Sequence, residues 1–311
     1  MEQNNKHDIY YKELLHLISG KMDIATQYVI FQTSQNQYFG LNVAKVEELI
    51  RNKNIDIVKS TNSDNLTIGV ANIRDNITIL LNFDDWIGED IENKDELKLI
   101  ILSKYSSFKM GLVVRNVIGI QSIDYDSLFD ITQRDDKVSY VVEVMIKGEK
   151  KMCNIFDFDQ LVADIYPNIK TINESLIDDM KIPIDKFSNK MVLVAEDSKL
   201  INEQLKILLD KINIPYHIFT NGKLLLEYLK KIDTDHIALI LTDLEMPVMG
   251  GLNLIKNLKN DPKYSTIPII VHTNITNNTI DEELEKLGVK NIVSKLNLIK
   301  LKESIMENIV C

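Results

Sequence analysis

Two hydrophobic patterns divide the chain. Between residues 27 and 156, short apolar stretches alternate with polar and turn residues at close spacing, which predicts many short β-strands. From Met191 onward, apolar strands alternate with segments whose apolar residues recur at helical spacing. The first pattern is typical of an all-β barrel-like or sandwich domain. The second is typical of a single doubly wound parallel sheet.

Helices are also predicted at three places before residue 166. Residues 8–19 form an amphipathic stretch that ends at Gly20, so a short helix is expected there. Residues 43–50 and 157–165 have the spacing of two further short helices. The strands expected in this part are Tyr28–Phe31, Gln37–Leu41, Thr67–Ile73, Ile77–Leu81, Lys98–Leu102, Met110–Val114, Val117–Ile123, Val138–Ile146 and Lys151–Phe156.

The second pattern predicts five strand–helix units. Its central strand is Ile237–Leu241, a continuous apolar run of the kind that is buried on both faces of a parallel sheet. The domains expected are an N-terminal helix or tail at 1–24, a β domain at 25–167, a linker at 168–188 and an α/β domain at 189–311. The other expected strands of the α/β domain are 191–195, 216–219, 267–272 and 291–293, with helices near 201–212, 222–231, 251–259, 279–287 and 298–309.

Composition and charge narrow the class of protein. The net charge is −10, with 21 basic against 30 acidic residues in 1–188 and 15 against 16 in 189–311. Neither part has the basic surplus of a nucleic-acid binder, so we expect protein partners. No apolar run approaches the length of a membrane span, and the start of the sequence has no signal-peptide pattern. Two distant cysteines, Cys153 and Cys311, fit a cytosolic protein.

Acidic residues follow two of the expected parallel strands. Glu196 and Asp197 come after the first strand, and Asp243 comes after the third. The carboxyl ends of parallel strands lie at one edge of a sheet, where ligands bind. Three clustered carboxylates repel one another unless a cation neutralises them, and hard oxygen ligands suit Mg²⁺. Each acid also has a plainer interpretation, as a turn cap or a helix N-terminal acid.

A hydroxyl and an amine complete the pattern. Thr273 follows the fourth strand, and Lys295 lies just after the fifth. A nucleophilic carboxylate, a Mg²⁺ pocket, a hydroxyl and a lysine at one edge are what phosphoryl transfer needs. Taken singly, Thr273 could be a helix N-cap and Lys295 a surface charge. Their joint placement favours the phosphoryl-transfer hypothesis.

These residues resemble the receiver domain of response regulators, over all of residues 189–311. The match rests on Glu196-Asp197, Asp243, Met246-Pro247, Met249-Gly250-Gly251, Thr273 and Lys295. Thr273 lies 30 residues after Asp243, and Lys295 lies 22 after Thr273, as in that family. The resemblance implies that Asp243 is the phosphoacceptor. It also implies that Glu196, Asp197, Asp243 and the backbone carbonyl of Glu245 hold Mg²⁺, while Thr273 and Lys295 hold the phosphoryl group.

Four positions depart from the receiver pattern. Leu296 follows Lys295 where proline is usual, and Gly250 replaces an acid. Asn274 stands where a small residue is common, so we expect access to the pocket to differ. Ile292 replaces the aromatic switch residue. The acceptor chemistry is expected to survive these changes, whereas the readout of phosphorylation is expected to differ.

The β domain has a resemblance of its own. The segment 68–75, Ile-Gly-Val-Ala-Asn-Ile-Arg-Asp, together with residues 81–83, looks like the signature of CheW-like coupling proteins, which form a double β-barrel. Asp75 takes the place of a glycine in that signature. The resemblance spans about residues 25–167 and implies partner contact through Arg74 and Asn72. For Arg74, a salt-bridged turn arginine is the plainer alternative.

A coupling domain followed by a receiver resembles the CheV family of chemotaxis proteins. That resemblance implies a non-enzymatic cytoplasmic adaptor at chemoreceptor arrays near the cell pole. It would link methyl-accepting chemoreceptors, and possible further CheW-like proteins, to the histidine kinase CheA. It implies no nucleic-acid partner and no membrane insertion. Two alternatives remain: a phosphate sink for the kinase, and an aspartate-nucleophile phosphatase. Such a phosphatase needs a second aspartate where Glu245 stands.

Overall fold

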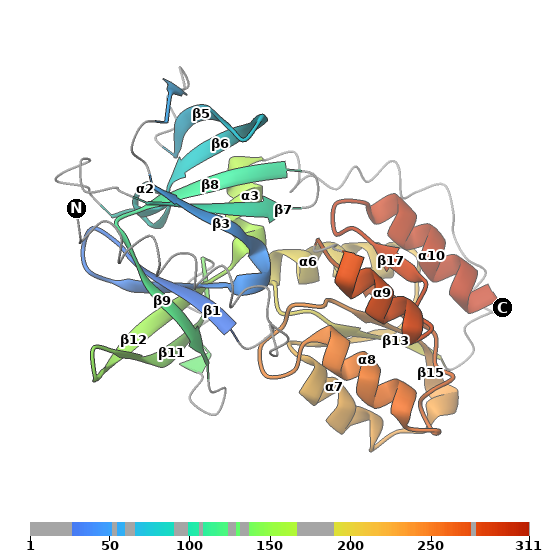
Figure 1. Ribbon diagram of the computed structural model, residues 1–311. Coiled ribbons are helices and arrows are strands. Elements are labelled where there is room, and N and C mark those ends of the chain that lie inside the picture. Colours follow the sequence, from blue (N-terminus) through green and yellow to red (C-terminus); the bar gives the residue numbers. More distant parts are fainter. Residues whose placement is uncertain are drawn as a thin grey trace. The chain divides into compact units, whose positions relative to one another are not determined.

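Two units make up the chain, Met1–Ile165 and Tyr166–Cys311, and each folds around its own core (Figure 1). The computed structural model describes residues 27–51, 55–59, 66–89, 99–105, 108–123, 129–130, 137–166, 190–274 and 278–310. The helix expected at 8–19 and the linker expected at 168–188 lie outside these residues. No helix in the described ranges is both long and apolar enough to cross a membrane.

The first sheet of the N-terminal unit has six strands. They are β1 (Gln27–Gln32), β2 (Tyr38–Asn42), β9 (Asn116–Ser122), β10 (Phe129–Asp130), β11 (Val138–Ile146) and β12 (Glu149–Phe156). The order is β10-β11-β12-β2-β1-β9, and only β12 and β2 pair in parallel. The side chain of Gln121 on β9 exchanges hydrogen bonds with the backbone of Met145 on β11, at 2.7 and 3.1 Å. These bonds connect the strand at one edge of the sheet, β9, to β11, which lies next to the opposite edge.

The second sheet also has six strands. They are β3 (Val46–Arg51), β4 (Ile57–Lys59), β5 (Thr67–Ile73), β6 (Asn76–Asn82), β7 (Leu99–Tyr105) and β8 (Phe108–Val114). The order is β3-β7-β8-β6-β5-β4, again with one parallel pair, β6 and β8. Each sheet has a separate apolar cluster, one around Ile30 and Val142 and the other around Leu80 and Ile100. This arrangement confirms the expected β domain.

Two short helices, α2 (Phe83–Ile87) and α3 (Phe158–Ile165), supply aromatic packing. The helix α3 was expected, but α2 was not. The ring of Phe83 packs against those of Phe31 and Phe39, with centroids 4.8 and 5.0 Å away. Trp86 donates a hydrogen bond from Nε1 to Asp164 Oδ2 at 3.0 Å. The aromatic contacts therefore join α2 to the first sheet, and Trp86 joins α2 to α3.

Two buried acids hold the loop between β1 and β2. Asp84 Oδ2 accepts hydrogen bonds from the backbone N–H of Ser34, at 3.1 Å, and from the Ser34 hydroxyl. Glu89 accepts from Thr33 Oγ1 at 3.0 Å and from the N–H of Gln35 at 3.1 Å. Burial raises the pKa of both carboxyl groups, because water no longer solvates their charge.

The helix expected at 43–50 is wrong for most of its length. A single 3₁₀ turn, η2 (Val43–Lys45), leads directly into the strand β3. The ladder between β3 and β7 shifts register between Val46 and Glu48, as at a β-bulge. Val46 and Leu49 are therefore both buried although they lie three residues apart, which is the spacing of a helix.

The second unit is a five-stranded parallel sheet in the order β14-β13-β15-β16-β17. Its strands are β13 (Met191–Ala195), β14 (Tyr216–Phe219), β15 (Ile237–Thr242), β16 (Ile269–His272) and β17 (Asn291–Val293). Its helices are α6 (Lys199–Lys211), α7 (Gly222–Leu229), α8 (Gly251–Asn260), α9 (Asn278–Lys286) and α10 (Leu298–Val310), with a 3₁₀ turn, η6 (Thr234–His236). The expected doubly wound sheet is confirmed.

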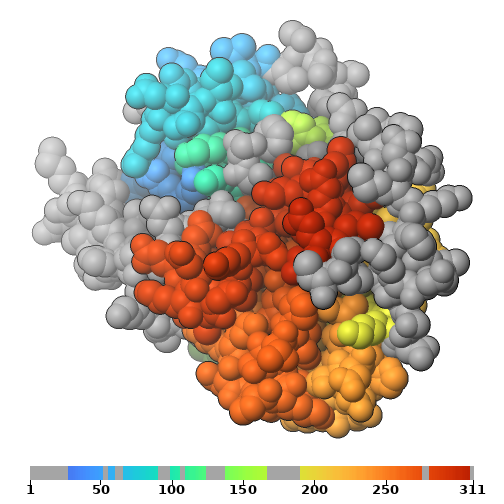
Figure 2. Space-filling model, turned by 90° about the vertical axis from the view of Figure 1, so that its right-hand side faces the viewer, coloured from blue at the N-terminus to red at the C-terminus, as the bar shows by residue number. Residues whose placement is uncertain are grey.

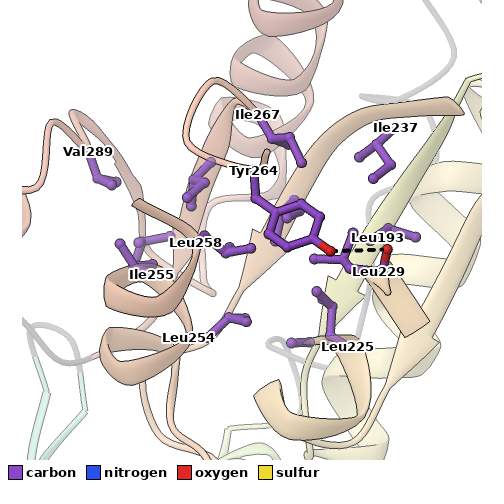
Figure 3. Close-up of a cluster of buried hydrophobic side chains, with 14 of the residues drawn as sticks. Leu193, Leu225, Leu229, Ile237, Leu254, Ile255, Leu258, Tyr264, Ile267 and Val289 are labelled. Atoms are coloured by element: carbon purple, nitrogen blue, oxygen red, sulfur yellow. Dashed lines mark hydrogen bonds between the residues drawn. The ribbon is translucent and has the colours of Figure 1, made fainter. Parts of the chain in front are cut away.

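Each face of this sheet has its own core. One cluster packs α6 and α10 against alternate residues such as Val192 and Leu239. The other packs α7, α8 and α9 against Leu193 and Ile240 (Figure 3), where Tyr264 donates to the carbonyl of Leu229 at 3.5 Å. Helices α8 to α10, orange to red, form much of the surface that faces the viewer in Figure 2.

Candidate functional site

The acids lie at the carboxyl edge of the parallel sheet because their strands stop immediately before them. Strand β13 ends at Ala195, next to Glu196, and β15 ends at Thr242, next to Asp243. Ala195 is paired with Thr242, and the N–H of Asp243 donates to the carbonyl of Ala195 at 2.9 Å. The two acidic positions are thus held side by side by the sheet register.

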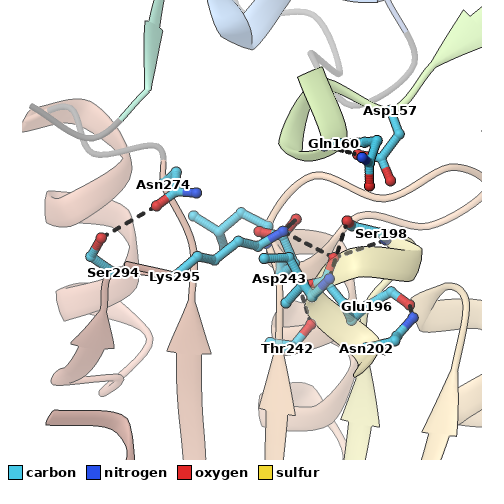
Figure 4. Close-up of polar contacts among 12 residues, drawn as sticks. Asp157, Gln160, Glu196, Ser198, Asn202, Thr242, Asp243, Asn274, Ser294 and Lys295 are labelled. Atoms are coloured by element: carbon cyan, nitrogen blue, oxygen red, sulfur yellow. Dashed lines mark hydrogen bonds and ion pairs between the residues drawn. The ribbon is translucent and has the colours of Figure 1, made fainter. Parts of the chain in front are cut away.

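Lys295 bridges the two acidic strand ends. Its Nζ lies 2.9 Å from Glu196 Oε1 and 2.9 Å from Asp243 Oδ2 (Figure 4). All three side chains are almost completely buried, with exposed fractions of 3% or less. One ammonium between two carboxylates compensates part of their mutual repulsion in a region of low dielectric.

Asp197 adds a third carboxylate. Single oxygen atoms of Glu196, Asp197 and Asp243 all lie within 4.8 Å of one another. Oxygen atoms this close can share one hard cation, and Mg²⁺ commonly takes one or two carboxylates together with several waters. The residues present therefore fit a Mg²⁺ ion, although their role as ligands stays a prediction. The same holds for the carbonyl of Glu245, which lies in the loop two residues after Asp243.

Residues around Glu196 were not anticipated from the sequence. The N–H of Ser198 donates to Glu196 Oε1 at 3.0 Å, and the Ser198 hydroxyl caps α6 by accepting from the N–H of Ile201. Asn202 Nδ2 donates to the carbonyl of Glu196 at 3.0 Å. A serine just before a helical apolar pattern is an N-cap signal, and it could have identified Ser198.

The loop after Asp243 is tightly built. Val248 has a φ of 65°, and the N–H of Met249 donates a hydrogen bond to the carbonyl of Pro247 at 2.6 Å. A positive φ is rare for a β-branched residue and stores strain. Gly251 lies so close to the Asp243 backbone that a Cβ there would be 1.9 Å from the Asp243 carbonyl oxygen. This position therefore requires glycine.

Thr273 and Asn274 continue from β16. The N–H of Thr273 donates to the carbonyl of Val293 at 3.0 Å, so Thr273 lies beside the end of β17. The hydroxyl of Ser294, which precedes Lys295, donates to Asn274 Oδ1 at 3.3 Å. The structure thus places the Thr273 and Lys295 loops next to each other. The contact of Thr273 and Lys295 with a phosphoryl group stays a prediction.

The residues expected to contact partners lie on the β5–β6 hairpin of the first unit. Asn72 is exposed on β5, and Arg74 and Asp75 form the turn with φ values of 49° and 62°. Positive φ at both central residues is the pattern of a type I′ turn, which glycine and asparagine favour. The Arg74 side chain is 75% exposed and contacts Glu48 at 2.6 Å. The ion pair expected as the plainer alternative therefore exists, and it leaves Arg74 accessible.

Two domain families match the chain. Residues 27–165 match the CheW-like domain, and residues 192–305 match the response regulator receiver domain. The chain is 27% identical over 279 residues to the chemotaxis protein CheV3 of Helicobacter pylori, covering 86% of this chain and 87% of that protein. It is 23% identical over 293 residues to CheV2 of the same organism, with 88% and 90% covered.

The chain is also similar to a solved structure. It is the scaffolding protein TtCheW from Thermoanaerobacter tengcongensis, with 21% identity and a TM-score of 0.38, and the match covers 43% of this chain and 89% of that one. The domain matches confirm the expected CheW-like β domain followed by an α/β receiver domain. With the CheV relatives, they support a coupling adaptor of chemotaxis.

Proposed function

We propose that this chain, which joins a CheW-like domain to a response regulator receiver domain in the manner of the CheV chemotaxis proteins, couples chemoreceptors to the histidine kinase CheA under control of Asp243. The CheW-like domain serves as the adaptor, and phosphorylation of Asp243 modulates the coupling. The chain acts in the cytoplasm at receptor arrays near the cell pole, and its only catalysis is of its own phosphorylation and dephosphorylation.

One observation carries the regulatory half of this proposal. Asp243 lies at a strand end, with the ammonium of Lys295 2.9 Å from its Oδ2 and with oxygen atoms of two further carboxylates within 4.8 Å. In the transfer, a carboxylate oxygen of Asp243 attacks the phosphorus of a phosphohistidine. A P–O bond forms as the P–N bond breaks, and the leaving imidazole nitrogen keeps the electron pair. A bound Mg²⁺ would neutralise charge on the transferring phosphoryl oxygens.

The chain's own groups would then stabilise the product. Lys295 is already held 2.9 Å from Asp243 and can turn its ammonium to a phosphoryl oxygen. Thr273, at the end of the neighbouring strand, can donate its hydroxyl to another. A doubly charged phosphoryl group favours the state in which both groups close on it. The phosphoryl group thereby biases a two-state receiver.

The adaptor half of the proposal assigns Asn72 and Arg74 to partner contact. The turn exposes the Arg74 guanidinium to solvent. A positive φ at a non-glycine residue costs about 1–3 kcal/mol, and residues with such backbone strain are concentrated at functional sites. Chemoreceptors, CheA and other CheW-like proteins are the partners we assign to this domain. Replacing Arg74 with alanine should weaken receptor-dependent kinase activation without changing phosphorylation of Asp243.

Phosphotransfer from purified CheA in the presence of Mg²⁺ tests the regulatory half. The wild type should take the phosphoryl group, and Asp243→Ala should not. Asp235→Ala is the matched control, because it makes the same substitution at an exposed aspartate of the same domain. A wild type that stays unphosphorylated, or an Asp243→Ala variant that is still phosphorylated, contradicts the proposal.

A measurement of receptor-dependent kinase activation distinguishes two hypotheses: that phosphorylation controls coupling, and that the receiver serves only as a phosphate sink. If phosphorylation controls coupling, wild type and Asp243→Ala should differ in kinase activation under phosphorylating conditions. If the receiver only drains the kinase, receptor coupling should be the same for both, while the lifetime of phosphorylated CheA lengthens with Asp243→Ala. The second result would replace regulated coupling with the sink function.

A further inference from the structure

A side-chain hydrogen bond joins the two loops that carry Thr273 and Lys295. Asn274 immediately follows Thr273, and Ser294 immediately precedes Lys295. The Ser294 hydroxyl donates to Asn274 Oδ1 at 3.3 Å (Figure 4). This distance is long for an O–H···O bond, whose usual range is about 2.5–3.0 Å. The contact can therefore shorten if the two loops approach each other.

The connection continues from Ser294 to α10. The Ser294 hydroxyl also accepts from the N–H of Leu296 at 3.3 Å, and the Ser294 carbonyl accepts from the N–H of Asn297 at 2.9 Å. Asn297 in turn caps α10, with its side-chain oxygen accepting from the N–H of Lys300 at 3.0 Å. A chain of hydrogen bonds thus runs from the residue after Thr273 to the first turn of α10.

No comparable polar link is available to the residue at position 292. Ile292 is half-buried and packs against the apolar cluster formed between the sheet and α7, α8 and α9. Its side chain carries neither donor nor acceptor, so it cannot report the position of the Thr273 hydroxyl by hydrogen bonding. In contrast, Asn274 and Ser294 lie in the same two loops as the groups that close on the phosphoryl oxygens.

We infer that Asn274 and Ser294 are positioning residues that make the Thr273 and Lys295 loops move together and pass that movement to α10. The inference rests on the proposed phosphorylation of Asp243. When Thr273 and Lys295 close on the phosphoryl group, the Asn274–Ser294 bond shortens, and the turn at 294–297 that caps α10 is held more firmly. The surface of α10 then differs between the two states.

Hydrogen exchange of the full-length chain tests this inference. The chain is incubated with Mg²⁺ and acetyl phosphate, and the phosphorylated fraction is measured by intact mass in the same samples. In the wild type, phosphorylation should slow exchange in the first turn of α10 by roughly two- to ten-fold, the factor that one net hydrogen bond gives. Ser294→Ala, compared at equal phosphorylated fraction, should lose this response.

Two further variants separate positioning from folding. Ser294→Thr keeps the hydroxyl and should keep the response of α10. Asn274→Ala removes the acceptor and should lose the response, with no additional loss in the double variant, because both changes remove the same bond. A phosphorylated Ser294→Ala chain that responds as the wild type does overturns the inference but leaves the proposed function intact. A wild type that takes no phosphoryl group overturns both.

Discussion

Replacing Lys295 with methionine removes the ammonium group that lies between the buried carboxylates of Glu196 and Asp243. Methionine keeps much of the length and apolar surface of the lysine stem, so the change is mainly electrostatic. In the wild type, Nζ is 2.9 Å from both Glu196 and Asp243, and Asp197 lies in the same cluster. In the variant these carboxylates face one another uncompensated until a proton or a metal ion joins them.

The size of the effect follows from burial. Removing one partner of a buried ion pair costs about 3–5 kcal/mol, because the remaining charge is neither solvated nor paired. Lys256 provides a comparison on the surface of the same domain, since its bridge to Glu283 is 40% and 38% exposed. A bridge of that kind contributes about 0–1 kcal/mol. Lys295→Met should therefore be several times more destabilising than Lys256→Met.

Urea unfolding followed by far-UV circular dichroism measures this difference. Far-UV circular dichroism is dominated by helices. Among the described elements, the four longest helices, α6, α8, α9 and α10, all belong to the receiver domain, so the signal reports mainly that domain. With a chelator present, Lys295→Met should lose about 3–5 kcal/mol. Mg²⁺ at about 100 times its dissociation constant should restore about 2.7 kcal/mol, because it binds only the folded site.

Mg²⁺ should also bind the variant more tightly than the wild type, since it no longer competes with the ammonium for Glu196 and Asp243. Equal stability of Lys295→Met and Lys256→Met in the presence of chelator would refute the electrostatic reasoning. So would a variant that Mg²⁺ stabilises less than it stabilises the wild type.

Three further changes test other parts of the structure. Gly251→Ala should destabilise the chain by about 1–3 kcal/mol and slow phosphorylation, because the new Cβ displaces the Asp243 backbone; an unchanged urea midpoint would contradict this. Asp75→Gly should stabilise the first unit by up to about 1 kcal/mol, because glycine adopts a φ of 62° freely; urea unfolding followed by the fluorescence of Trp86, which lies in that unit, measures the change, and a lower midpoint would show that the Asp75 side chain matters more than the strain. Asp84→Asn tests a pH dependence, because burial raises the pKa of the Asp84 carboxyl above its ordinary value of 3.8. The protonated carboxyl therefore stabilises the fold fully below pH 3.8, and this contribution is lost as the pH rises through the pKa of the folded state. Followed by the fluorescence of Trp86 in the same unit, the urea midpoint of Asp84→Asn should therefore rise relative to that of the wild type between pH 3.8 and neutral, and a difference that does not change with pH would contradict the assignment.

Local patterns were sufficient where burial follows a regular period. The run Ile237–Leu241 is buried on both sides, so its continuous apolar sequence predicted β15 to within one residue. The helices of the second unit likewise show their buried faces in their spacing. The prediction at residues 43–50 failed because the β-bulge at Val46 and Glu48 places inward side chains three residues apart.

Two of the very short elements were also missed, the strand β4 and the helix α2. They have three and five residues, too few for either to repeat a hydrophobic pattern. Asn82 caps the start of α2, and Gly88 ends it with a φ of 81°, so the signals of this helix lie at its two ends. Its place in the fold depends on aromatic packing with β1 and β2, which are distant in sequence.

The sequence by itself determined which chemical groups the receiver domain offers, because each acid, hydroxyl or amine lies within two residues of the end of an apolar strand, and parallel strands end at one edge. The tertiary structure alone decided which of these groups meet. Lys295 reaches Glu196 across 99 residues, and Ser294 reaches Asn274 across 20. Such contacts depend on strand order, loop path and side-chain direction, and none of these leaves a periodic trace in the chain.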